Sequence, residues 1–127
     1  MNDKSFSIHA SFFPIRLTAF VQNNVEMEIT IVNNTEEIYW VECDVELPDP
    51  ISLAQDRKLS KGRSRIGIVG PKGRVTNRIK VYGGASSYPE IYKLKLTAYG
   101  FDQQGVIHVR NSQSAKLRCE RIGDQKE

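Results

Sequence analysis

The chain has 127 residues, of which 39% are hydrophobic and 26% charged, with a formal net charge of +3. This composition is typical of one globular domain and excludes a chain that is disordered throughout. No apolar run approaches the ~18–20 residues of a membrane-spanning helix, and the polar residues 1–5 do not resemble a secretory signal. We therefore expect a single cytoplasmic domain without a membrane partner, unless the chain is a fragment of an exported protein. Its core should span about 5–121, followed by a short flexible tail over 122–127.

Alternation of apolar and polar residues, which indicates a half-buried strand, recurs from the start of the chain. The first segment, 6–20, is bent at Pro14 and is expected at a sheet edge, because proline cannot donate to a sheet ladder. The next alternation, over 25–31, ends at an Asn-Asn turn signal. Another strand is expected over 39–47, where the prolines of 48–50 end it.

The second half of the chain continues this pattern in shorter segments. One helical turn is possible at 53–58, within a polar stretch. Strands separated by turn residues are expected over 65–69, 75–82 and 92–98. Residues 106–121 form either a hairpin or one strand interrupted by a bulge. Seven or eight short strands predict an all-β, antiparallel immunoglobulin-like sandwich with Greek-key topology and minimal helix.

Two stretches carry a resemblance to known domains. One is 29–35, a strand ending in an Asn-Asn turn and followed by the strand 41–47; the other is 92–100, preceded by a corner containing Tyr88-Pro89. Over about 25–120 the chain resembles immunoglobulin-like accessory domains of bacteria and archaea, namely CARDB-type domains and sandwich domains attached to some glycosidases. The resemblance implies the fold and a binding or spacer role, and it supplies no functional residues. Those domains are usually exported repeats of long chains, whereas this chain is short and has no evident export signal.

Groups that could perform catalysis are few. His9 and His108 lie near opposite ends of the chain, and no H-E-x-x-H, G-x-S-x-G, C-x-x-C or Walker-type motif is present. The glycine-rich segment 67–73 lacks the Gly-Lys-Ser/Thr ending of a phosphate loop and predicts a turn. We therefore expect no enzymatic activity, no cofactor and no metal site.

The two cysteines, Cys43 and Cys119, fall on the apolar faces of their strands. In an immunoglobulin-like order one strand lies between them, which separates them by ~9.5 Å. This exceeds the ~7 Å limit for a disulfide between Cα atoms. Two free, buried thiols are expected, and a redox or metal pair is the alternative.

The position of Trp40 decides whether it is a core residue or an exposed interface residue. Strict alternation places it with Glu42 and Asp44, away from the core. A bulge or the start of the strand can instead turn it inward, where immunoglobulin folds often keep a tryptophan. If exposed, Trp40 belongs to the residue types enriched at interface hot spots.

Charge is unevenly distributed along the chain. Residues 17–56 contain nine acids and no Lys or Arg, whereas 57–80 contain nine bases and no acid. Part of the acidic block should pair across the sheet, because the strand 39–47 is expected beside the strand 92–98. The acids expected to face Lys93 and Lys95 are Glu42, Asp44 and Glu46. This pairing leaves the basic block unexplained.

The basic block is expected to form an exposed, mobile loop over 56–65 and a basic stripe on one side of the strand 75–82. It either binds a polyanion such as RNA, DNA, anionic lipid or an acidic protein, or keeps a sheet edge soluble. The sequence thus predicts a non-catalytic protein-interaction or scaffolding module, with an unknown protein partner or self-association through a sheet edge. Nucleic-acid binding by 57–80 is the alternative, although no aromatic residues for base stacking interleave with the bases. The candidate binding residues are Trp40, Arg57, Lys58, Lys61, Arg63, Arg65, Lys72, Arg74, Arg78 and Lys80.

Overall fold

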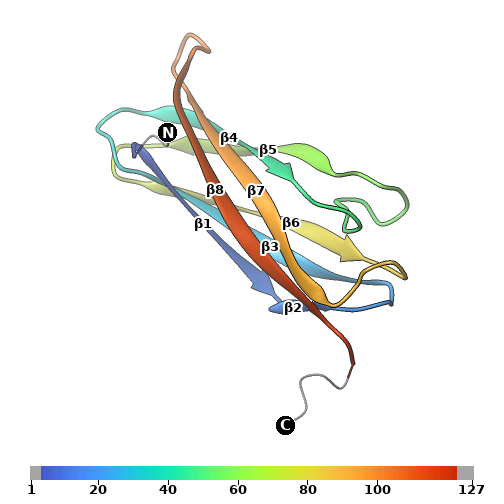
Figure 1. The fold of residues 1–127 in the computed structure, drawn as a ribbon. Coiled ribbons are helices and arrows are strands. Elements are labelled where there is room, and N and C mark those ends of the chain that lie inside the picture. The colour runs from blue at the N-terminus through green and yellow to red at the C-terminus, as the bar shows by residue number, and fades with distance from the viewer. Residues whose placement is uncertain (1–3, 123–127) are drawn as a thin grey trace.

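The computed structural model describes residues 4–122, which form two β-sheets packed face to face and contain no helix (Figure 1). One sheet has the order β1-β3-β6 and the other the order β2-β8-β7-β4-β5. The strands are β1 (Phe6–Phe13), β2 (Arg16–Thr18), β3 (Asn23–Asn33), β4 (Tyr39–Glu46), β5 (Lys61–Val69), β6 (Arg74–Gly83), β7 (Glu90–Phe101) and β8 (Ile107–Glu120). The predicted all-β sandwich is confirmed. The helical turn considered at 53–58 does not form, and 123–127 of the predicted tail lie outside the described residues.

The core lies between the sheets and is built by alternate residues of the central strands. On β3 and β7 the inward side chains are almost completely buried, while their neighbours in the sequence face outward. These inward residues are Val25, Met27, Ile29 and Ile31 on β3, and Tyr92, Leu94, Leu96 and Ala98 on β7. Alternation was therefore a reliable guide to these strands.

The predicted bent first strand is divided between the two sheets. β1 pairs antiparallel with β3, whereas β2 pairs parallel with β8. The chain changes sheet at Pro14, whose peptide bond with Phe13 is cis. Both strands lie at the edges of their sheets, as expected for a segment interrupted by proline.

Two segments differ from their predicted form. β5 begins at Lys61, so residues 61–65 of the expected mobile loop form an edge strand paired with β4. Its inward positions carry the small residues Gly62 and Ser64, which hid the alternation. Residues 107–120 form one long strand, paired with β7 along the length of the molecule, as Figure 1 shows. The register shift in this pair lies at Gly100/Phe101, not in the middle of β8.

The predicted neighbours β4 and β7 pair directly, and β7 separates the two cysteines. Cys43 and Cys119 are both buried and free, as expected. Burial raises the pKa of the Cys43 thiol to about 12 and also raises that of Cys119. Neither thiol is therefore poised to act as a nucleophile.

Candidate functional site

Apolar and aromatic side chains gather at one end of the outer face of the five-stranded sheet. In the register of the strands, Trp40 lies opposite Ile68 of β5 on one side and Phe101 of β7 on the other. Ile68 is 66% exposed and Trp40 39%. Tyr99 follows on the same face of β7, with its ring centroid 6.5 Å from that of Phe101. We call these four residues, Ile68, Trp40, Tyr99 and Phe101, the Trp40 face.

A network of charged side chains holds the indole of Trp40 in place. Trp40 Nε1 donates to Glu42 Oε2 at 2.8 Å, and Arg63 Nη1 lies 3.4 Å from Glu42 Oε1. Arg63 also donates to both carboxylate oxygens of Asp44, with Nε at 2.6 Å and Nη2 at 3.0 Å. The guanidinium Cζ lies 4.9 Å from the centre of the Tyr99 ring. Arg63 thus connects the aromatic residues to two carboxylates. These contacts within the chain fix the geometry of the side chains before any partner protein binds.

The same contacts set the ionisation of the network. The hydrogen bond from Arg63 lowers the pKa of the Asp44 carboxyl, and the same bond raises the pKa of the Arg63 guanidinium. Both groups are therefore charged at neutral pH. The Trp40 face consequently presents aromatic rings beside a fixed ion pair.

Trp40 follows strict alternation and lies on the outer face of β4. It does not take the inward position that tryptophan often has in immunoglobulin folds. The bulge in this part of the sheet falls where Glu42 pairs with Arg65 and Val41 with Gly67, so the extra residue belongs to β5. β4 keeps its alternation for that reason. The adjacent Tyr39 packs against the core instead, with its ring edge-to-face on Phe6.

The acidic block pairs with the basic block, which corrects the predicted pairing with β7. Glu46 does lie opposite Lys95 in the register, but Glu42 lies opposite Tyr99 and Asp44 opposite Thr97. Glu42 and Asp44 bond instead to Arg63, because β5 lies on the other side of β4. On the other sheet, β6 lies beside β3 in the same way. The ion pairs formed by bases of segment 57–80 are Arg57–Asp56, Lys58–Asp49, Arg63–Asp44, Arg63–Glu42, Lys72–Glu36 and Arg78–Glu28.

Four of the predicted binding bases have no ion pair within residues 4–122. Arg74 and Lys80 share the outer side of β6 with Arg78, as the alternation predicted. Lys61 and Arg65 lie on the outer side of β5, in the other sheet. The predicted basic stripe is thus interrupted by the Arg78–Glu28 pair and divided between two sheets.

Sequence reasoning missed three of the four residues in the Trp40 face. Tyr99 and Phe101 lie beyond the end of the predicted strand 92–98. Ile68 was placed in a short strand without a partner. Their common signal is an aromatic or branched residue on the polar side of a strand alternation, which becomes informative only when strand neighbours are known.

Few polar groups converge elsewhere in the described part of the chain. Asp102 Oδ2 lies 2.7 Å from His108 Nε2, in the turn that joins β7 to β8. The backbone amides of Val106 and Gln104 also donate to Asp102 and lower its pKa, Val106 most strongly, so this carboxylate serves to close the turn. Residues 4–122 hold no group of three or more metal-binding side chains and no helix long and apolar enough to span a membrane.

No known family matches the sequence, and a comparison with curated proteins gives no match. Among solved structures, the fold is similar to the C-terminal domain of wzt, with a TM-score of 0.57 and 14% identity over 94% of this chain and 75% of that chain. It is also similar to the alkylpurine DNA glycosylase AlkC of Pseudomonas fluorescens bound to DNA containing an abasic site analog. That match has a TM-score of 0.50 and 10% identity, and it covers 91% of this chain and 30% of the glycosylase.

A CARDB domain from Pyrococcus furiosus, in complex with di-metal ions, matches with a TM-score of 0.49 and 10% identity, over 94% of this chain and 92% of that chain. The resemblance to CARDB-type domains predicted from the sequence is thus found among solved structures as a weak likeness of fold. At these identities the comparisons concern the fold alone. The chain is an immunoglobulin-like β-sandwich, similar in fold to the C-terminal domain of wzt.

Proposed function

We propose that this chain is a non-catalytic protein-interaction or scaffolding module and that its contact surface is the Trp40 face. The observation that carries the proposal is the exposed indole of Trp40, held by Glu42 beside an Arg63–Asp44 ion pair. Tryptophan, tyrosine and arginine are the residues most enriched among interface hot spots. Because their side chains are already fixed, binding loses less side-chain entropy than it would at a mobile surface.

The solved structures support an accessory role for a domain of this fold. The wzt match is a named C-terminal domain, and the chain matches 30% of the length of the glycosylase AlkC. In both cases the similar part belongs to a larger protein. A domain that acts as part of a larger assembly needs a surface for its neighbours, and the Trp40 face supplies one.

Nucleic-acid binding by 57–80 stays a prediction and receives less support from the geometry. Five of its nine bases already pair with acids of the same chain. A base that must leave an ion pair to contact a phosphate gains less from that contact, because one charge pair replaces another. Three aromatic residues, Trp40, Tyr99 and Phe101, lie at the Trp40 face, where Glu42 and Asp44 would repel a phosphate backbone.

In-cell photo-crosslinking tests the proposal directly. The full chain is expressed in its native host with the crosslinking amino acid p-benzoylphenylalanine at Ile68, and as a matched control at Thr76, an exposed position of the other sheet. We expect discrete crosslinked protein species from Ile68 that disappear when Trp40→Ser is added. Equal species from Thr76, or species that persist in the Trp40→Ser variant, would show that the Trp40 face is not the contact surface.

A further inference from the structure

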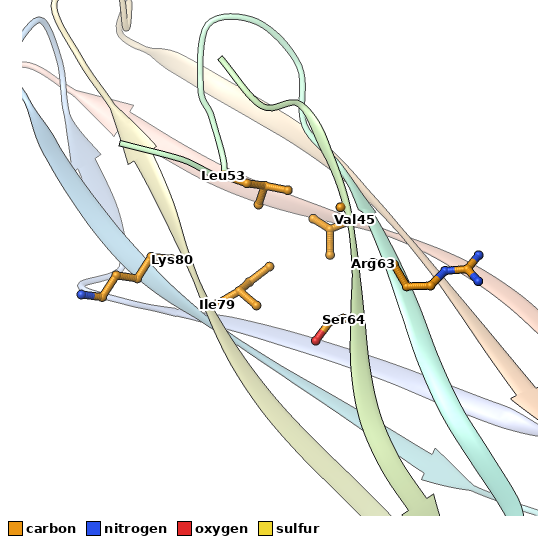
Figure 2. A pocket seen from close by; sticks show the side chains of 7 residues that line it. Val45, Leu53, Arg63, Ser64, Ile79 and Lys80 are labelled. Carbon is orange, nitrogen blue, oxygen red and sulfur yellow. The ribbon is translucent and has the colours of Figure 1, made fainter. Parts of the chain in front are cut away.

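A narrow apolar groove opens between the two sheets on the side where β5 and β6 lie. Figure 2 shows Val45, Leu53 and Ile79 pointing toward one another across this space, with Ser64 beside them. Together with Gly62, these residues line a groove of about 220 Å³. Val45 comes from β4, Leu53 from the segment between β4 and β5, and Ile79 from β6, so the groove runs directly beneath β5.

The small inward residues of β5 create this groove. A Cβ atom at Gly62 would lie 3.0 Å from Leu53 Cδ1, so only glycine lets Leu53 sit where it does without displacement. Ser64 accepts a hydrogen bond from the Asn77 side chain of β6, which joins the two sheets at this level. On the central strand β3 the inward positions carry the larger side chains of Val25, Met27, Ile29 and Ile31. The outermost strand therefore covers the interior less completely than the central strands do.

β5 is also an edge strand with unused backbone groups. Among the described strands it pairs only with β4, and it ends the order of the five-stranded sheet. The backbone N–H and C=O groups on its other side are therefore available to an additional strand. Such a strand would direct every second side chain toward the groove and the others outward.

Charge determines which strand fits. Lys61 and Arg65 point outward on β5, opposite Glu46 and Glu42 of β4 in the register. Neither base forms an ion pair within the described residues, whereas Arg63 between them is bound to Asp44. Lys80 stands at the rim of the groove on β6 and points away from it, as Figure 2 shows. In an antiparallel pairing of two copies centred on Arg63, Lys61 of one copy would face Arg65 of the other. Like charges directly opposite destabilise a strand pair, so these bases disfavour self-association and favour an acidic partner.

We propose that β5 binds an extended acidic segment of a partner protein, which adds to the sheet as a sixth strand. The segment has acidic residues opposite Lys61 and Arg65 and apolar residues opposite Gly62 and Ser64. Strand addition of this kind takes affinity from backbone hydrogen bonds and specificity from alternate side chains. The apolar side chains fill the groove, and the acids pair with Lys61 and Arg65. This surface is the free edge of β5 at 61–65 with the groove beneath it, whereas the Trp40 face lies on the outer side of the sheet and shares β5 with it through Ile68. The Trp40→Ser variant distinguishes the two proposals.

A synthetic peptide tests the inference. Its five central positions are glutamate, valine, threonine, isoleucine and glutamate, and its binding to the full chain is measured by fluorescence anisotropy of a dye on the peptide. We expect saturable binding that weakens about tenfold in the Lys61→Glu/Arg65→Glu variant. A peptide with lysine in place of both glutamates should recover binding to that variant. The matched control, Lys93→Glu/Lys116→Glu, makes the same charge change on the outer face of β7 and β8 and should bind like the wild type.

Further arms separate strand addition from general attraction between charges. A peptide with N-methyl groups on alternate residues keeps its side chains but loses backbone donors, and it should bind at least about tenfold more weakly. Gly62→Val, which fills the groove, should also weaken binding, with circular dichroism confirming that it folds. Trp40→Ser should bind the peptide normally. The inference is overturned if the N-methylated peptide binds equally well, if polyuridylic acid or polyaspartate competes as strongly as the peptide, or if the charge reversal on β5 has no more effect than the control.

Discussion

Replacing Arg63 with methionine should disconnect the network that holds Trp40, while keeping the aliphatic part of the side chain. The two bonds to Asp44, at 2.6 and 3.0 Å, join side chains that are 45% and 30% exposed. Exposed pairs of this kind contribute about 0.2–1 kcal/mol, and the two-pronged geometry favours the upper end. The contact with Tyr99 adds roughly 0.5–1 kcal/mol. We therefore expect Arg63→Met to lower the free energy of unfolding by about 1–2 kcal/mol.

Urea denaturation followed by tryptophan fluorescence is the appropriate assay, because Trp40 is the only tryptophan in the chain. A double-mutant cycle with Asp44→Asn should give a coupling energy of about 1 kcal/mol at low salt and clearly less at 1 M salt. The pKa of Asp44 is lowered in the folded state, so its contribution is complete above its ordinary pKa near 3.8 and is lost as the pH falls through the folded value. Arg63→Met should consequently make stability less sensitive to acid below the ordinary pKa of Asp44, 3.8.

A coupling energy below about 0.3 kcal/mol at low salt, the level at which independent sites are additive, would show that Arg63 and Asp44 do not stabilise each other. An equal loss of stability of wild type and Arg63→Met on acidification would contradict the same interaction. Acrylamide quenching gives an independent measure, since an indole released from Glu42 should be quenched more readily than the hydrogen-bonded one. Arg110→Met is the control, because its guanidinium lies 6.0 Å from the centre of the Tyr99 ring and, within the described residues, forms no hydrogen bond with Glu42 or Asp44.

Three further outcomes follow from the packing. Gly100→Ala should lower the free energy of unfolding by about 1–3 kcal/mol, because the new Cβ would lie 2.7 Å from Phe6 Cζ. In urea denaturation Phe6→Leu should reduce this loss, and strictly additive effects of the two changes would contradict the predicted clash. Asn33→Ala should lower the melting temperature and reduce the free energy of unfolding by about 1–3 kcal/mol, because the buried amide donates to the carbonyls of Glu37 and Gly70. A change in unfolding free energy below about 0.5 kcal/mol by calorimetry would refute this. Cys43 and Cys119 should react with a disulfide reagent at pH 8 only after denaturation, because burial raises both thiol pKa values; rapid labelling of the native protein would argue otherwise.

The strands with one buried apolar face could be predicted from the sequence. The alternation of 25–31 and 39–47 directly records which side chains enter the core, Cys43 among them. For Trp40 the sequence left the outward and the inward position open. β5 was not predicted over its full length, because Gly62 and Ser64 give no apolar signal at its inward positions. A strand whose inward side chains are small has the sequence pattern of a polar loop.

The partners of the charged residues could not be predicted, because they depend on which strands become neighbours. Arg78 bonds Glu28 across 50 positions of sequence, since β6 lies beside β3. Alternation specifies the face of a side chain but not the strand opposite it. The expected pairing with β7 was correct for the strand neighbours and wrong for Asp44, whose partner is Arg63 of β5. The Trp40 face escaped prediction for the same reason.

The acidic and basic blocks also attract each other in the unfolded chain. Nine acids in 17–56 are followed directly by nine bases in 57–80, so the unfolded chain carries two adjacent segments of opposite sign. Their attraction acts over the Debye length of about 10 Å at 0.1 M salt and brings together the same segments that later form the β3–β6 and β4–β5 pairs. The unfolded ensemble is therefore biased toward contraction around its middle. Salt screens this early attraction, so it should slow the search for the native strand neighbours.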